Sequence, residues 1–316
     1  MKPGEYVREA RPNPLVKAGD FLTALATYPL TCWRHREIVK NFYSRELRAR
    51  FRGTLLGFAW PFLLPLVLFF VYYFVFAQLF GAKFGIPDLT GPDGEAAGKR
   101  WFTVYLFVGV IVWSGYAEAI QRNCTVILEN ANLIKKIAFP SEIFPLNVIL
   151  VSVTIQAIAI VAYLTVSPVL GWNPMSWRLL ALPVLFAVQI FLSLGLSLVF
   201  AASHVFIRDT LPLLSIGMTL WQFMTPVFWS AQALPAIEQY RWVLKWNPMA
   251  YLLEGYRKVL VNPGLPQYKA LDASQAFPTA EWPWRECNIV FWSALVLFIV
   301  GYSIFLSCKG KFADEL

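Results

Sequence analysis

Six stretches of the chain contain no Asp, Glu, Lys or Arg, and the segments between them carry the charge. They cover residues 53–82, 101–117, 143–177, 179–207, 210–237 and 287–308. A helix needs about 20 apolar residues to cross the ~30 Å hydrocarbon core of a bilayer, because each residue rises ~1.5 Å. Five stretches reach that length. The stretch from Trp101 also reaches it if its helix continues past Glu118 to about Ile120.

Backbone groups inside lipid find no water, so a spanning segment must satisfy its own hydrogen bonds, as a helix does. The pattern therefore predicts an all-α integral membrane protein with six transmembrane helices. We expect a transmembrane domain over 53–308, between tails at 1–32 and 309–316. The spans are expected at about 54–80, 101–120, 143–169, 179–203, 210–230 and 287–308.

Basic residues are concentrated before the first predicted span. Residues 1–52 contain eleven Lys and Arg, whereas residues 81–100 contain three. Because Lys and Arg accumulate in cytoplasmic segments, we expect both termini in the cytoplasm. Residues 81–100, 170–178 and 231–286 then face outward. The first twenty residues lack the apolar core of a signal peptide, so we expect the first span to direct insertion.

Residues 33–52 predict an amphipathic helix on the inner leaflet. At ~100° per residue, Arg34, Arg45, Arg48 and Arg52 project in one narrow wedge. The opposite side is expected to hold Ile38, Val39, Phe42, Tyr43 and Leu47. Two interpretations of the basic side remain open. It either binds lipid phosphates in general or guides an anionic, lipid-linked substrate toward an entrance. The candidate ligands for a head group or pyrophosphate are Arg45, Arg48, Arg50 and Arg52.

The first half of the outer segment 231–286 is amphipathic and rich in Tyr and Trp. Such a pattern is found in helices at a membrane interface. Because Pro226, Pro235 and Pro248 interrupt it, we expect short helices that enter the membrane from outside and leave again. A helix lying on the outer leaflet is the alternative. The remainder, up to residue 286, predicts a polar excursion.

Composition narrows the class of protein. The chain is 58% hydrophobic and 15% charged with a net charge of +8, which favours a membrane over nucleic acid as its partner. It contains no GxxxxGK[ST] loop to cradle phosphates, so we expect a transport subunit rather than an enzyme. The four cysteines have no metal-like spacing to His35 or His204, and neither a metal nor a cofactor is expected on this chain.

The predicted spans carry essentially no charged residue. A charge at the bilayer centre costs roughly 2.5 to 3.5 kcal/mol and usually marks an ion or proton pathway. A proton- or sodium-coupled carrier is therefore disfavoured. Energy for transport would have to come from a partner.

Four strings, in order along the chain, resemble the membrane subunits of type-2 ABC exporters that move polysaccharides. RARFRGTLLGFAWPFLLPLVLFFVYYFVFAQLF (48–80) is similar to the family's first-span signature, and ENANLIKKIAFPSEIFPL (129–146) to its cytoplasmic loop after span two. FIRDT (206–210) resembles the element before span five. TPVFWSAQALP and WNPMAYLLEGYRKVL resemble the external gate region. The aromatic richness looks most like the O-antigen and teichoic-acid branch.

This resemblance implies a homodimer of six-span subunits in the bacterial inner membrane, each bound to a cytoplasmic ATPase that carries ATP and Mg. The substrate would be a lipid-linked polysaccharide that passes between the two subunits. Export of teichoic acid, capsular polysaccharide or a small lipid or drug is the alternative within the family. A structural protein or scramblase that works without ATP is the alternative from another class.

Aromatic side chains are the candidates for the substrate path. A ring can stack on the C–H face of a sugar and let it slide, but Trp and Tyr also anchor membrane interfaces, and both interpretations apply here. Trp60 and Trp101 lie near span ends and fit the anchoring role better. The path candidates are Tyr72, Tyr73, Tyr105, Trp113, Tyr116, Trp221, Phe223 and Trp229.

The resemblance also assigns a coupling helix to the loop 122–140. Leu133 and Ile134 would be its apolar anchors on the ATPase, with Asn132, Lys135 and Lys136 around them. Enforcing the positive-inside topology is the alternative role for the two lysines. Arg208 and Asp209 either contact the ATPase or the second subunit, or form a local ion pair.

Overall fold

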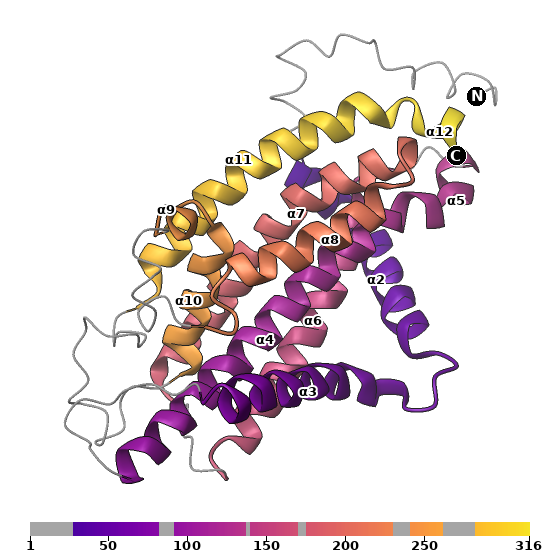
Figure 1. Cartoon of the computed structure of the whole chain (residues 1–316). Helices are drawn as coiled ribbons and strands as arrows, with labels where there is room; N and C mark the ends of the chain where they lie inside the picture. Colours follow the sequence, from indigo (N-terminus) through magenta and orange to yellow (C-terminus); the bar gives the residue numbers. More distant parts are fainter. Residues whose placement is uncertain (1–27, 82–91, 137–139, 170–174, 230–240, 262–281) are drawn as a thin grey trace, which may run out of the picture.

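The computed structural model describes residues 28–81, 92–136, 140–169, 175–229, 241–261 and 282–316, and these residues form helices and no strands (Figure 1). The α-helices are α2 (Arg36–Phe51), α3 (Trp60–Tyr73), α4 (Pro92–Glu129), α5 (Ala131–Lys136), α6 (Ile143–Val166), α7 (Leu182–Phe206), α8 (Thr210–Met224), α9 (Arg241–Lys245), α10 (Pro248–Leu260), α11 (Trp284–Lys309) and α12 (Phe312–Glu315). Short helices of other types are η1 (Gly57–Ala59), η2 (Phe74–Leu79) and η3 (Trp177–Ala181). The all-α prediction is confirmed for the described residues.

Four helical segments in the described part of the chain are long and apolar enough to cross a membrane. They are Trp101–Glu129, Ile143–Val166, Trp177–Phe206 and Trp284–Lys309, at the places of the second, third, fourth and sixth predicted spans. The predicted N-terminal tail up to residue 27 and the outer residues 82–91, 230–240 and 262–281 lie outside the described residues.

The helices at the first and fifth predicted spans are shorter than the sequence suggested. The first is apolar over Pro65–Leu79, where the π-helix η2 continues α3. The fifth, α8, ends at Met224 after 15 residues, which is about 22 Å. It ends there because a residue that precedes proline avoids the helical region, and Thr225, before Pro226, is extended.

Small and polar side chains let the long helices pack closely. α7 packs against α4, α6 and α11. A Cβ placed on Gly301 of α11 would lie 2.1 Å from the carbonyl oxygen of Gly195 on α7, so the two backbones touch at these glycines. Between α6 and α7, the side chains of Gln156 and Gln189 exchange hydrogen bonds of 3.0 and 2.6 Å. Both amides are buried, and each satisfies the other.

One end of the helix bundle gathers the segments that were predicted to face the cytoplasm. α5, α12 and the turn between α7 and α8 lie together at the end where the chain terminates (Figure 1). α12 contacts α5 and α7, and the Phe312 ring lies 6.2 Å from that of Phe206. The start of α4 and helix α9 lie toward the opposite end. Segments that are far apart in the sequence thus lie together at each end of the bundle.

The short helix α10 lies inside the bundle, in contact with α4, α7 and α11. Ten of its thirteen residues are buried. Its first turn is fixed by Asn247, whose side chain accepts a hydrogen bond of 3.1 Å from the backbone N–H of Met249, and by Pro248. The alternative of a helix lying on the outer surface is therefore wrong for this segment.

Candidate functional site

A cavity of about 490 Å³ lies between α2, α3, α4, α6 and α8, and we call it the polar compartment. Its volume falls within the roughly 300 to 1,000 Å³ of ligand sites. Its lining combines four aromatic rings, three carboxamides and one pair of opposite charges. These residues are Phe51, Trp60, Tyr72, Trp113, Gln121, Gln156, Gln222, Arg50 and Glu118. Rings and carboxamides together suit a ligand with both apolar faces and hydroxyl groups.

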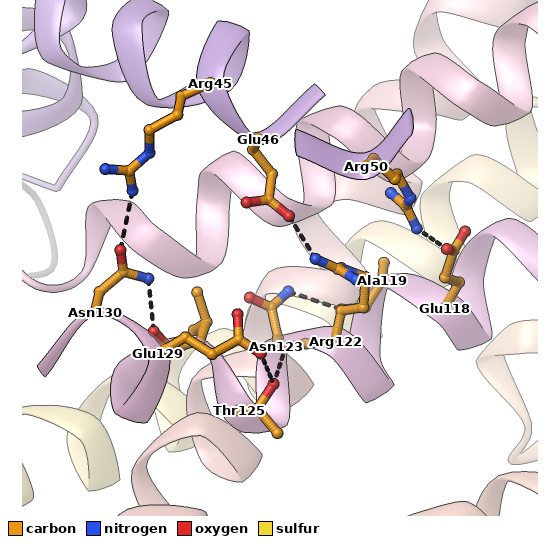
Figure 2. Close-up of polar contacts among 11 residues, drawn as sticks. Arg45, Glu46, Arg50, Glu118, Ala119, Arg122, Asn123, Thr125, Glu129 and Asn130 are labelled. Carbon is orange, nitrogen blue, oxygen red and sulfur yellow. Dashed lines mark hydrogen bonds and ion pairs between the residues drawn. The ribbon is translucent and has the colours of Figure 1, made fainter. Parts of the chain in front are cut away.

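The charged pair joins α2 to α4 across the wall of the polar compartment. The guanidinium of Arg50 contacts the carboxylate of Glu118, as Figure 2 shows. The Arg50 side chain is 10% exposed, whereas that of Glu118 is 42% exposed. Burial, reinforced by the neighbouring Arg122, lowers the pKa of Arg50 to about 10. Arg50 therefore keeps its positive charge at neutral pH.

Two further contacts extend this connection along α4 (Figure 2). Arg122 donates a hydrogen bond of 2.7 Å to Glu46, and Arg45 donates one of 3.0 Å to the side chain of Asn130. Asn130 directly precedes α5, and its carbonyl accepts a hydrogen bond of 3.0 Å from the backbone N–H of Leu133. The contacts of α2 thus run from the polar compartment to the start of α5.

The four arginines predicted to bind a lipid head group divide into two pairs. Arg45 and Arg50 face α4, as described above. Arg48 and Arg52 are exposed, and Arg48 donates a hydrogen bond of 3.0 Å within its own helix to the carbonyl of Ser44. Only Arg50 of the four lines the polar compartment.

The eight path candidates lie in three places. Tyr72 and Trp113 line the polar compartment. Trp60, for which the sequence favours a role as an anchor at the membrane interface, lines it too. The Trp113 ring lies 5.9 Å from the Trp221 ring in an edge-to-face arrangement and 6.2 Å from the tilted ring of Tyr116, which is fully buried. Tyr73 lies elsewhere on α3, where it stacks on Phe69. Of the eight candidates, Tyr72 and Trp113 therefore line the polar compartment, and Tyr116 and Trp221 contact the Trp113 ring.

The remaining three candidates, Tyr105, Phe223 and Trp229, are linked by hydrogen bonds at the C-terminal end of α8. The hydroxyl of Tyr105 donates a hydrogen bond of 3.3 Å to the carbonyl of Trp229. The indole N–H of Trp229 donates one of 3.0 Å to the carbonyl of Phe223, whose ring is exposed. They pack the segment after α8 against α4 and do not line the polar compartment.

The predicted coupling residues lie at the end of the bundle that gathers the chain terminus. Asn132 and Lys135 are exposed on α5, while Leu133 and Ile134 are half-buried. The side chain of Lys136 lies outside the described residues. Arg208 and Asp209 are exposed in the turn between α7 and α8 at the same end (Figure 1).

The sequence analysis did not predict a cluster of buried charges on α10. Lys258 forms an ion pair of 2.9 Å with Glu286 of α11, and both side chains are buried. Arg257 is fully buried, with its guanidinium 3.3 Å from the Tyr105 ring centre. Arg257 also donates a hydrogen bond of 3.1 Å to the carbonyl of Val227. The sequence does contain a pattern that could have predicted this cluster. Glu254, Arg257 and Lys258 are spaced three and four residues apart, so a helix places the three charges on one face.

The described residues contain four helices that are long and apolar enough to cross a membrane, and two of them, α4 and α6, line the polar compartment. These helices indicate the class of the protein, a multi-pass membrane protein. The family follows from comparison of sequences. The chain belongs to the ABC-2 type transporter family, whose model matches residues 39–261, and members of this family are the membrane permease subunits of ABC transporters.

The relatives that the chain resembles carry a more specific name. It is 26% identical over 284 residues to an O-antigen export system permease protein RfbA of Myxococcus xanthus, which covers 90% of this chain and 97% of that protein. Two proteins of the same name from Klebsiella pneumoniae are each 26% identical to it, over 221 and 216 residues, with 68% of this chain and 76% of each relative covered. The chain is thus a homologue of O-antigen export permeases.

Proposed function

We propose that this chain is the membrane permease of an ATP-driven exporter that moves a lipid-linked, O-antigen-like polysaccharide across the bacterial inner membrane. The observation that carries the proposal is the family match, together with similarity to an O-antigen export permease along nearly the whole of both chains. The chain has no phosphate-cradling loop of its own, so a separate cytoplasmic ATPase would bind ATP and Mg.

The proposed subunit has six spans with both termini in the cytoplasm. The first span is α3 with its π-helical extension, since Trp60–Leu79 covers twenty residues, or about 30 Å. The fifth is α8 with the segment that follows it to Trp229. Two subunits form a homodimer, and the polysaccharide passes between them. No charged carrier site within the spans is needed because the ATPase supplies the energy.

The end of the bundle that holds α5 is the proposed contact with the ATPase. Leu133 and Ile134 would enter a groove of the partner, while Asn132, Lys135 and Lys136 surround them. Arg208 and Asp209 belong to the same surface. The proposal is supported by the common location of these segments, which are separated by some seventy residues along the chain.

Replacing Leu133 with Asp tests the coupling. Co-expressed with its ATPase, the wild-type chain should support glycan export, and L133D should abolish it and release the ATPase in affinity purification. L133M, which keeps an apolar side chain of similar volume, should retain both. Unchanged export by L133D would refute the assignment of α5.

An ATPase variant that cannot hydrolyse ATP distinguishes the proposed ATP-driven exporter from a structural protein or scramblase that works without ATP. Export by the wild-type permease should stop with this partner. Export that continues would instead indicate a scramblase. The chemical composition of the glycan that accumulates inside cells lacking the permease distinguishes O-antigen-like polymers from teichoic acid, capsule or a small lipid.

A further inference from the structure

The helix α5 is too short to be stable by itself. It comprises six residues, Ala131–Lys136, and isolated helices shorter than about 12 residues are only marginally stable in water. The carbonyl of Asn130 accepts hydrogen bonds of 3.0 and 3.2 Å from the backbone N–H groups of Leu133 and Ile134. These bonds form the first turn, but they do not set the direction in which it faces. The orientation of α5 therefore depends on packing against another part of the chain.

That other part is α12. Among the described elements, α5 makes its most extensive contact with α12, and both lie at the same end of the bundle in Figure 1. Leu133 and Ile134 are half-buried, and they pack against the apolar cluster to which Phe312 belongs. Leu316, directly after α12, packs against the same cluster. The buried part of each α5 side chain thus faces this cluster, and the exposed part remains for a partner.

Phe312 attaches α12 to the ends of two long helices. Its side chain is fully buried. The ring lies 5.3 Å from that of Phe305 on α11, edge to face, and 6.2 Å from that of Phe206, the last residue of α7. α12 has only four residues and cannot be stable alone. Phe312 therefore connects α5, through α12, to α7 and α11.

An ion pair fixes the end of α11 beside the chain that follows α5. Nζ of Lys309, the last residue of α11, lies 2.7 Å from Oε2 of Glu142, which directly precedes α6. The Glu142 side chain is only 8% exposed, so salt screens this pair less than it screens a surface pair. The start of α12 follows Lys309 by three residues. The ion pair therefore holds the start of α12 near α5 independently of the Phe312 ring.

We propose that α12 positions α5 for the ATPase, and that Phe312 is a positioning residue for this contact. Phe312 is fully buried, so it acts through α5 rather than by touching the partner. This inference rests on the proposed function, because it takes α5 as the helix to which the ATPase binds. Phe206 lies two residues before Arg208, so the same ring also links α5 to the second part of the proposed ATPase surface.

Loss of the Phe312 ring should change how often α5 is correctly placed, without changing the side chains that α5 presents. Leu133 and Ile134 remain available, but only in a fraction of the molecules. The apparent affinity of a partner falls in proportion to the fraction of molecules in the binding-competent state. A positioning residue therefore differs from a contact residue in its response to excess partner. A high concentration of ATPase should restore binding to F312A but not to L133D.

Hydrogen exchange of the purified full-length chain in nanodiscs, without ATPase, tests the placement of α5 directly. In F312A, the amides of Leu133 and Ile134 should exchange at least about tenfold faster than in wild type, because α5 opens more often. The amides around Gly301 in α11 should keep their protection. F312L keeps an apolar side chain and should give an intermediate rate, so the test does not depend on how well F312A accumulates. Wild-type exchange of α5 in both variants would overturn the proposal.

Titration with the purified ATPase measures the consequence for binding. F312A should bind about tenfold more weakly than wild type but reach the same saturation, and F312L should lie between them. L133D should remain unbound at ATPase concentrations that saturate F312A. Wild-type affinity of F312A, or a defect that excess ATPase does not restore, would contradict the positioning role.

Two control variants distinguish positioning from other effects. Glu315 is exposed on α12, so E315Q should leave the exchange of α5 and the affinity for the ATPase unchanged. Phe228 is also buried, but it follows the far end of α8 by four residues. F228A removes a ring of the same size and should leave the exchange of α5 unchanged. Exchange of α5 that is as fast in F228A as in F312A would overturn the proposal, because general loss of packing would then release α5.

The two measurements keep a failure of this inference apart from a failure of the proposed function. Exchange is measured without the ATPase, so faster exchange in F312A combined with a wild-type chain that binds no ATPase would contradict the proposed function alone. Intact ATPase binding and export by the wild-type chain, combined with wild-type exchange in F312A and F312L, would contradict the positioning role alone.

Discussion

The buried ion pair between α10 and α11 gives a quantitative test of how these two helices are held together. Lys258 and Glu286 are 8% and 6% exposed, and the Nζ–Oε1 distance is 2.9 Å. Removing one partner of such a pair costs about 3 to 5 kcal/mol, because the other charge stays buried without compensation. K258M and E286Q should each lower the free energy of unfolding by about this amount.

The double variant K258M/E286Q should be much less destabilised than the sum of the two single variants. Neither uncompensated charge is present in it, and replacing both members of a buried ion pair is often close to neutral. Contacting residues in one network usually show coupling energies of about 0.5 to 3 kcal/mol, and we expect a value at or above the upper end of this range, because each single variant leaves one buried charge without its partner. The neighbouring Glu254 and Arg257 stay in place in all three variants and keep the rest of the cluster constant.

Reversible unfolding in mixed micelles, followed by tryptophan fluorescence, measures this double-mutant cycle. R285Q, next to Glu286 in sequence, serves as a control for removing a charge from the exposed side of α11. It should change the free energy of unfolding by less than about 0.5 kcal/mol. Single-variant effects below about 1 kcal/mol, or effects that add without coupling, would show that the pair is solvated and refute the reasoning.

Two further predictions concern packing and capping. G301A should lower the free energy of unfolding by about 1 to 3 kcal/mol, since its Cβ would lie 2.1 Å from the Gly195 oxygen. G217A, whose Cβ would have nothing within 4 Å, should not destabilise the protein, and thermal unfolding compares the two variants. N247A removes the cap of α10 and the hydrogen bonds to Trp221 and Thr225. Chemical denaturation should therefore show that N247A lowers the free energy of unfolding by about 2 to 4 kcal/mol.

Charge-free stretches predicted the positions of the four membrane-length helices in the described part of the chain, but they could not predict where each helix ends. α4 begins at Pro92, well before the predicted start at Trp101, because the polar residues before Trp101 continue the same helix. α8 ends at Met224, inside an uninterrupted apolar stretch, because Pro226 forces Thr225 out of the helical region. Hydropathy averages over such local backbone preferences.

The sequence indicated which residue types line the polar compartment, aromatic rings and arginine, but it could not indicate which individual residues do so. Trp113 and Tyr116 are three residues apart on α4, yet the first lines the polar compartment and the second is fully buried. A helix that is apolar on all sides has no periodic signal to show which face meets a cavity. The buried charges on α10 were missed for a related reason. Lys258 is neutralised by Glu286, 28 residues away, and a local pattern does not show that pairing.

The contacts of α2 explain why the compartment wall and the start of α5 belong to one structural unit. Glu118 lies on α4 and Asn130 directly follows the last residue of that helix, twelve residues further along the chain, which is about 18 Å at the helical rise. Arg50 and Arg45 of α2 bind these two positions. Because two separate points fix α2 on α4, α2 cannot tilt or slide without breaking at least one of them. We therefore expect a displacement of α5 at the end of α4 to move both helices together, and with them the arginine that faces the polar compartment.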